Sequence, residues 1–133
     1  MDLRAVIRGD WTILAVCTNE ERCDVLDFVG RLERDDPGES ARLMRAFARV
    51  AACGPPRNVR RSRALARDIF ELKTTGGVRV LYFFDEGRTI VCSDALLRPR
   101  QHGLEVAVQR AARCRWRYLN DKRRGSLRTR EDR

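Results

Sequence analysis

Apolar and polar positions first predict a strand followed by two helices. The run WTILAVC at residues 11–17 is short, apolar and rich in residues that favour strands. Residues 19–35 and 37–53 then place apolar side chains three or four positions apart, as on one face of a helix. Asp36 and Pro37, between the two runs, are typical of a helix N-terminus. Because the link is so short, we expect the two helices to form an antiparallel hairpin.

The second half of the chain predicts three strands and a final helix. IFELK, GVRVLYFF and RTIVCSDALL have the composition of strands, and TTGG and DEG between them are typical of tight turns. Residues 103–119 return to helical spacing. The element order is therefore β-α-α-β-β-β-α, one α+β domain over residues 1–119. Residues 57–67 form a basic connector in this interpretation, and we expect residues 120–133 to be a basic, disordered tail.

Composition narrows the class of protein. The 133 residues are 43% hydrophobic and 35% charged, which suits one globular domain. No apolar run approaches the roughly 20 residues that cross a bilayer. The opening MDLRAVIRGDW lacks the apolar stretch of a signal peptide, so we expect a cytoplasmic protein that does not contact membranes. Five cysteines, one histidine and no CxxC pair predict reduced core thiols, without a metal or another cofactor.

The net charge of +9 is concentrated in two blocks. Residues 57–79 carry seven arginines and lysines against two acidic residues, and residues 98–133 carry twelve against four. Clustered positive charge favours a polyanion, either a nucleic acid or an acidic protein. A solvated basic tail would explain much of the second block. It would not explain Lys73 and Arg79, which interrupt apolar runs that we expect to be strands.

Alternation along these strands predicts where their side chains point. Arg79 and Leu81 should share one face of the sheet, and Val80 and Tyr82 the other. Tyr82 is therefore expected in the core rather than beside Arg79, unless a bulge intervenes. Glu71 shares a face with Lys73 at a spacing of two, so we expect an ion pair or a role on the sheet surface for it rather than a role as a base.

Over roughly residues 11–112, the chain resembles the RelE/ParE toxin superfamily in its order of strand, helical hairpin and three-stranded meander. It most closely resembles the HigB-like, phage-derived branch. LARDIFELK (65–73) is similar to a stretch of that branch in which a basic residue, here Lys73, follows Glu-Leu. GVRVLYFFDEGRTIV (77–91) is similar to the next stretch, with Arg79 as the family arginine and Tyr82 as the family tyrosine. The resemblance implies a RelE-like fold, in which the helical hairpin packs on a small, twisted, mostly antiparallel sheet.

The third matching stretch, SDALLRPRQ (93–101), departs from the family pattern. Asp94 stands where the family usually has a histidine, and Leu96 stands where it has a phenylalanine. The usual pair of lysines is replaced by Arg98 and Pro99, with Arg100 next. Positive charge is retained, but proline changes the backbone and removes an N–H donor.

The resemblance implies a toxin of a type II toxin–antitoxin system that cuts mRNA on the ribosome and so inhibits translation. Such enzymes use no metal: the ribose 2′-OH attacks the adjacent phosphorus and the 5′-oxygen leaves. The implied partners are a cognate antitoxin protein and the ribosome with its mRNA. The protein can withdraw a proton, stabilise charge on the phosphate and protonate the leaving group.

Four residues are candidates for this chemistry. The resemblance implies that Arg79 and Arg98 contact phosphate, and that Lys73 is a second phosphate contact or a base. His102, the single histidine, is a candidate acid or base near neutral pH. A further set of arginines is expected to bind RNA. Those near Trp116 are interleaved with aromatic residues, which suits RNA, and the others lie in the two basic blocks. That set is Arg60, Arg61, Arg63, Arg100, Arg113 and Arg117.

Two other classes of function fit the same pattern. A ParE-like toxin would bind DNA gyrase without cutting RNA, and fold alone does not separate it from the nuclease. A non-catalytic nucleic-acid-binding protein could retain the scaffold and its cations while lacking a proton-transfer group. Trp116 and Tyr118 could equally pack on the core as the apolar side of an amphipathic helix.

Overall fold

The computed structural model describes residues 1–58 and 61–131 as three helices and an open sheet of seven strands, an α+β fold. The N-terminal half holds β1 (Asp2–Arg8), β2 (Thr12–Cys17), α1 (Asp24–Asp35) and α2 (Pro37–Cys53). The C-terminal half holds β3 (Ser62–Ala66), β4 (Ile69–Lys73), β5 (Val78–Asp85), β6 (Thr89–Leu97), α3 (Gln101–Arg123) and β7 (Arg128–Glu131).

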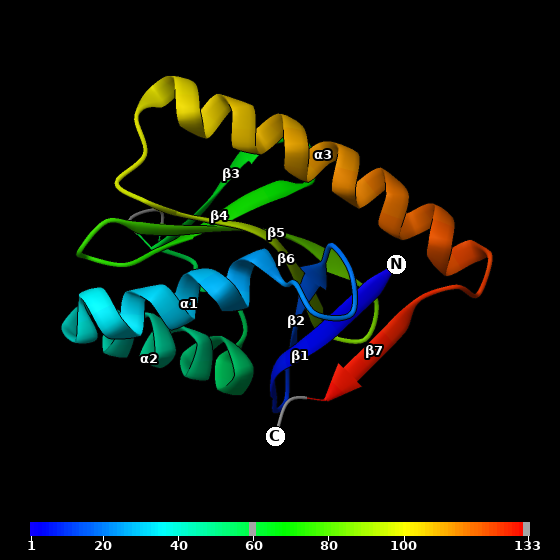
Figure 1. Cartoon of the computed structure of the whole chain (residues 1–133), viewed down its shortest axis with the longest axis horizontal. Coiled ribbons are helices and arrows are strands. Elements are labelled where there is room, and N and C mark those ends of the chain that lie inside the picture. Colours follow the sequence, from blue (N-terminus) through cyan, green and yellow to red (C-terminus); the bar gives the residue numbers. More distant parts are fainter. Residues whose placement is uncertain (59–60, 132–133) are drawn as a thin grey trace.

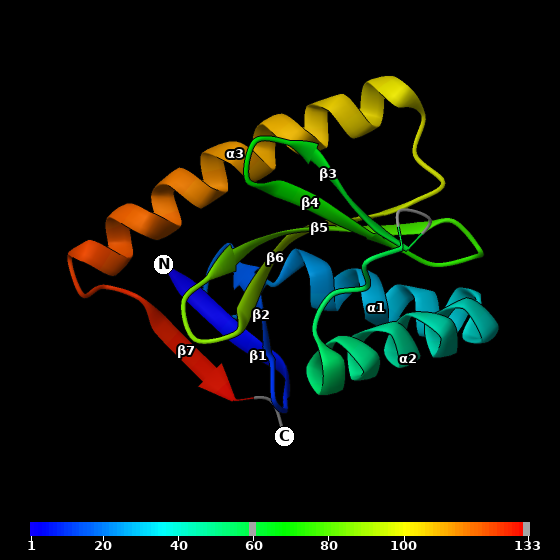
Figure 2. The ribbon, with the colours of Figure 1, turned by 180° about the vertical axis from the view of Figure 1, so that it is seen from behind.

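The sheet is mostly antiparallel, and its strand order is β3-β4-β5-β6-β2-β1-β7. The pairs β2–β6 and β1–β7 are parallel, and the others are antiparallel. Figures 1 and 2 show α1 and α2 side by side on one face of the sheet and the long α3 across the other. The molecule therefore has three layers, and the sheet separates two apolar cores.

Alternation along the strands fills the two cores. Leu72, Val80 and Tyr82 point into the core beneath α1 and α2. Leu81 and Phe83 point into the core beneath α3. The register shift in the β5–β6 pair falls at Ser93 of β6, so β5 itself keeps its alternation. The prediction that Tyr82 lies in the core is confirmed: only 1% of its surface is exposed.

The helical hairpin forms as the sequence predicts, with one difference at its start. Asp36 accepts a hydrogen bond from the backbone N–H of Glu39 at 3.2 Å, which caps α2 behind Pro37. The first helix begins at Asp24 and not at residue 19. The side chain of Asn19 accepts hydrogen bonds from the N–H groups of Glu21 and Arg22, and this local turn competes with a helix.

Three strands lie outside the predicted order. The basic connector contains β3, and the first residues of the chain form β1, whose Leu3 and Ala5 enter the core beneath α3. The expected disordered tail is instead ordered through Glu131 in this structure: α3 continues to Arg123 and β7 pairs with β1.

Every residue of β7 is exposed, so no apolar pattern could have predicted this strand. Backbone hydrogen bonds hold it beside β1, beginning with Arg128 N–H to the Met1 carbonyl at 3.0 Å. Ion pairs add to this pairing: Arg130 with Glu20 at 2.9 Å, and Arg8 with Glu131.

None of the helices in residues 1–58 and 61–131 combines the length and the apolar character needed to cross a membrane. The cysteines at 17, 23 and 92 are buried and free, as expected for small core residues, whereas Cys114 is half-buried and Cys53 is exposed. Burial raises the pKa of the Cys17 thiol to about 12, so it stays protonated at neutral pH.

The turn between β4 and β5 is packed against a buried carboxylate. Glu39 of α2 is fully buried and accepts hydrogen bonds from the Thr74 hydroxyl and from Arg42 Nε, the latter at 2.7 Å. A methyl group on Gly76 would overlap the Glu39 carboxylate. The turn therefore needs glycine at residue 76 because of this close approach.

We expect Gly76→Ala to lower the free energy of unfolding by about 2 kcal/mol, because neither Glu39 nor the turn can move freely. Gly103→Ala is a matched control, since nothing lies within 4 Å of the added methyl group. Gly103 lies in α3, so this control should gain up to about 1 kcal/mol from helix propensity. Urea unfolding of both variants checks the prediction, and equal stability of the two would contradict it.

Candidate functional site

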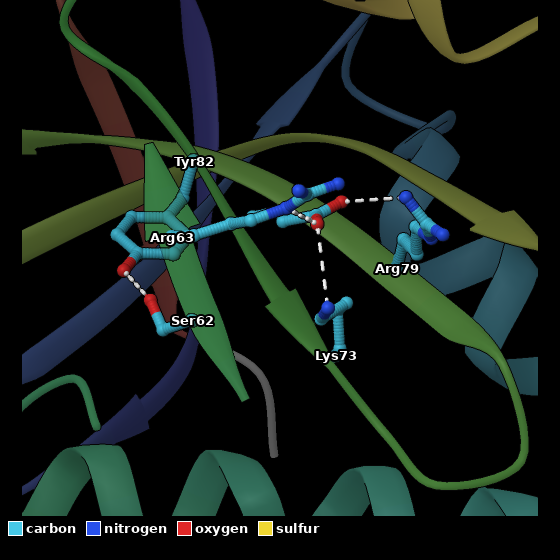
Figure 3. A network of polar contacts seen from close by, with 6 residues as sticks. Ser62, Arg63, Lys73, Arg79 and Tyr82 are labelled. Carbon is cyan, nitrogen blue, oxygen red and sulfur yellow. Dashed lines mark hydrogen bonds and ion pairs between the residues drawn. The ribbon is translucent and has the colours of Figure 1, made fainter. Parts of the chain in front are cut away.

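One buried carboxylate gathers three cations on the half of the sheet formed by β3, β4 and β5. Glu71 of β4 is 0% exposed. Its Oε1 lies 2.7 Å from Arg63 Nε and 3.9 Å from Lys73 Nζ, and its Oε2 lies 3.2 Å from Arg79 Nη1. Figure 3 shows Arg63, Lys73 and Arg79 converging from three adjacent strands. We refer to these four residues as the Glu71 cluster.

The sheet register assembles this cluster. Arg63 pairs directly with Glu71 across β3 and β4. Lys73 pairs directly with Arg79 across β4 and β5. Glu71 and Lys73 are two residues apart, so both point to the same face of β4. The prediction of an ion pair between Glu71 and Lys73 is confirmed, although the pairs with Arg63 and Arg79 are shorter.

The cluster explains why cations interrupt these strands. A buried, ionised carboxylate without partners would cost several kcal/mol, and cations placed directly around it offset that cost. Three cations against one carboxylate leave a net charge of about +2. The side chains of Arg63, Lys73 and Arg79 are 46%, 23% and 27% exposed, so the excess charge reaches solvent. The cluster is therefore both a structural ion pair and an exposed patch of positive charge.

Tyr82 does not belong to this patch. Its hydroxyl lies 2.7 Å from the Ser62 hydroxyl inside the core beneath α1 and α2. Burial raises the pKa of the Tyr82 phenol, even though the bond to Ser62 opposes the rise. Arg79 points to the other face, as alternation predicts.

Arg98 lies near the other buried carboxylate, Glu39. Its backbone is in the left-handed region, with φ of 46°, and its N–H donates to the Gly77 carbonyl at 2.8 Å. Its side chain packs against Gly77, where a Cβ would collide with it. Burial raises the pKa of Glu39, but the bonds from Thr74 and Arg42, with the charges of Arg42 and Arg98, hold it below the ordinary value.

A cleft of about 500 Å³ opens between α2, the segment that enters β3, and the end of β4. Its apolar lining residues are Ala46, Pro56 and Leu72, and we refer to these three as its apolar floor. Cationic and polar side chains surround that floor: Arg42, Arg45, Arg49, Asn58, Arg61, Lys73, Thr74 and Thr75. We call this feature the α2–β4 cleft. Lys73 belongs both to its lining and to the Glu71 cluster, so the two features adjoin.

The charges of the cleft are only partly neutralised. Arg42 is paired with Glu39, at 2.7 Å. Arg45, Arg49 and Arg61 are exposed and form no ion pair with any residue that the structure describes. Five cations around an apolar floor are suited to a ligand with anionic groups and a flat apolar part.

Sequence reasoning did not find the α2 arginines, although a signal was present. Positions 42, 45 and 49 are three and four residues apart and share one side of the helix. The apolar positions Leu43, Phe47 and Val50 mark the buried side of the same helix. The apolar face predicts the helix, and the same spacing places the three arginines together on its charged side.

The remaining predicted residues lie apart from the cluster. Arg100 and His102 are exposed at the N-terminus of α3. Arg113 and Arg117 are exposed on α3, where Trp116 is 67% exposed and Tyr118 is 2% exposed. Tyr118 therefore packs on the core, whereas Trp116 does not. Arg60 lies outside the described residues.

Comparison with known proteins gives one match. A family model described as "Phage derived protein Gp49-like (DUF891)" matches residues 31–112, more than half of the chain. Searches among curated proteins and solved structures give no significant match. The matched region includes α2, β3 to β6 and the first half of α3, and so contains the Glu71 cluster and the α2–β4 cleft.

We expect Glu71→Gln to lower the free energy of unfolding by about 2 kcal/mol, because three neighbouring cations lose their common partner. The loss should shrink in 1 M salt, which screens the repulsion among the cations. Glu33→Gln, at an exposed position of α1, should change stability by less than about 0.5 kcal/mol. Urea unfolding at low and high salt gives both values, and a salt-independent loss would indicate a packing defect instead.

We expect Glu39 to contribute to acid unfolding. Its folded pKa is lowered, so its ionised form stabilises the protein above the ordinary value of 4.5, and this contribution is lost as the pH falls through the folded pKa. The difference in stability between wild type and Glu39→Gln should therefore be constant above about pH 6 and shrink below pH 4.5. Thermal unfolding from pH 3 to pH 7 measures it. A difference that does not vary with pH would contradict the ionic role.

Proposed function

The chain belongs to the phage-derived Gp49-like family, a family of RelE-like and toxin-like proteins, and from this premise we propose that it is a toxin that cuts mRNA on the ribosome. The proposal includes a HigB-like role in a type II toxin–antitoxin pair, with a cognate antitoxin as its inhibitor and a cytoplasmic site of action. The Glu71 cluster is the observation that carries it: Lys73 and Arg79 are held in position, carry excess charge and remain partly exposed to solvent.

The proposed reaction is an in-line displacement at phosphorus. The O2′–P bond forms and the P–O5′ bond breaks, which leaves a 2′,3′-cyclic phosphate and a 5′-hydroxyl. The 2′-OH loses a proton and the leaving O5′ gains one. Negative charge increases on the phosphate oxygens in the transition state, where a preorganised cation is most effective.

Arg79 is suited to that charge. Its guanidinium is anchored through one nitrogen, Nη1, at 3.2 Å from Glu71. The planar fork has further N–H donors that can bind phosphate oxygens in pairs. Lys73, directly across the strand pair, would supply a second positive charge. Arg98 and Arg100 at the end of β6 would contact the phosphates on either side of the cut.

The two proton transfers need an acid and a base. Among the described residues, the ion pairs and hydrogen bonds of the Glu71 cluster involve no histidine or tyrosine. His102 is close in sequence to Arg98 and Arg100, and it serves as the proposed proton carrier. The lack of such a group beside Arg79 favours the second candidate, a toxin or nucleic-acid-binding protein that binds without cutting, as in gyrase inhibition.

Cell-free translation followed by primer extension tests the proposal. We expect the wild type to cut mRNA only when ribosomes are translating it. Arg79→Ala should reduce the cleavage rate about 10²- to 10³-fold, as when one transition-state donor is removed. Arg98→Ala should reduce it by at least about tenfold. Arg67→Ala is the matched control, because its side chain is 97% exposed and its one ion pair with a described residue is to Asp68, at 3.9 Å. It should cleave like the wild type.

Two results would overturn the nuclease. Intact mRNA with normal translation would exclude it, and inhibition of gyrase supercoiling by the same preparation would then establish the second candidate. If Arg79→Ala cleaves as fast as the wild type, the protein is a nuclease but the Glu71 cluster is not its active site. Circular dichroism of each variant separates loss of activity from loss of fold.

A further inference from the structure

We propose that the α2–β4 cleft is a nucleotide subsite for single-stranded RNA, in which one base rests on the apolar floor and the flanking phosphates bind the arginines of α2. The inference rests on the proposed function, because it makes the cleft the continuation of the RNA path from the Glu71 cluster. It assigns a role to Arg45 and Arg49, which neither the sequence pattern nor the family match singles out.

The size and chemistry of the cleft fit one nucleotide. Its volume of about 500 Å³ lies within the usual range for pockets that hold a small organic molecule. A nucleobase is largely apolar on its faces, and the apolar side chains in the lining, Ala46, Pro56 and Leu72, are suited to pack against such a face. Thr75, exposed at the rim, has a hydroxyl that can bond the base edge or the ribose.

The spacing of the arginines fits a phosphate chain. Arg42, Arg45 and Arg49 lie on one side of α2 and span seven positions, about 10 Å along the helix axis. Neighbouring phosphates of a single strand are several ångströms apart, so two of them can contact this row. Arg45 and Arg49 have no acidic partner among the described residues, which leaves their charges available to an external anion.

Lys73 connects the cleft to the proposed cutting site. It lines the cleft, and its Nζ lies 3.9 Å from Glu71 Oε1 in the cluster that also holds Arg79. The cluster lies on the α3 side of the sheet and the cleft on the α2 side, so RNA that passes Arg79 would reach α2 by turning around the end of β4. An acidic protein segment could also satisfy the charges. The apolar floor beneath them favours a base, because acidic side chains have no large flat apolar part.

Binding of an uncleavable RNA tests the subsite separately from the nuclease. The probe is a fluorescein-labelled 12-nucleotide 2′-O-methyl RNA, which lacks the attacking hydroxyl, and the readout is fluorescence anisotropy with the purified full chain. We expect the double variant Arg45→Ala/Arg49→Ala to bind about 25-fold more weakly at 0.1 M salt, because each lost phosphate contact costs about fivefold. The slope of log K against log salt should fall by about 1.4.

Arg31→Ala/Arg34→Ala is the matched control. It removes the same charge from exposed positions of the neighbouring helix α1, outside the cleft. We expect it to weaken binding no more than about twofold, because these charges act only at long range. Equal losses in the two double variants would overturn the subsite and indicate diffuse attraction. No loss in the cleft variant would overturn it as well.

A second probe tests the base. An abasic sugar-phosphate chain of the same length should bind the wild type about fivefold more weakly than the RNA, since the floor then has no apolar partner. Equal affinity would overturn the nucleotide assignment. RNA binding that depends on Arg45 and Arg49, without any cleavage by the wild type, would support the subsite while removing the nuclease. Cleavage and binding that are unchanged in the double variant would support the nuclease and overturn the subsite.

Discussion

The buried carboxylate of Glu71 sets the arrangement of the cationic half of the sheet. A charge with no exposure to solvent must be neutralised by nearby groups, and residues on the same strand and on the two adjacent strands are close enough to reach it. The register supplies Arg63 from β3, Lys73 from β4 and Arg79 from β5. These cations therefore cannot be exchanged for apolar residues without leaving Glu71 unpaired. The presence of arginine and lysine within the strands follows from that constraint before any function is considered.

A second buried carboxylate, Glu39 of α2, holds the turn between β4 and β5 in place. Glu39 reaches from α2 to Thr74 and Arg42 and packs under Gly76, while Arg98 covers Gly77. The turn after β4 is thus held against the helical hairpin. The strand β4 itself is held to its neighbours β3 and β5 by the ion pairs of the Glu71 cluster. Both attachments keep Lys73 in a defined position between the cluster and the cleft. Rigid placement of cations of this kind is what a phosphate-binding surface requires.

Much of the fold could be predicted from sequence, because local patterns of apolar and polar residues indicate most of its helices and strands. Apolar spacing predicted both helices of the hairpin, β2, the strands β4 to β6 and α3. Alternation predicted the opposite directions of Arg79 and Tyr82, which their surroundings confirm. The strand β7 could not be predicted, because its four exposed residues owe their place to backbone pairing with β1, more than 120 residues earlier. The third and closest cation of the cluster, Arg63, was missed as a partner because it lies in a strand that the sequence pattern did not indicate.

The site was harder to predict than the fold because it depends on which charges remain unpaired. Sequence shows how many arginines there are. The structure adds that Arg63 and Arg42 are paired, while Arg45 and Arg49 have no ion pair with any described residue. Unpaired like charges along one side of a helix repel one another and lower stability by a few tenths of a kcal/mol per pair. A polyanion that binds the folded chain removes this repulsion and stabilises the fold by mass action. The region where the chain retains uncompensated positive charge next to an apolar floor is therefore also the region where an anionic ligand would stabilise it most.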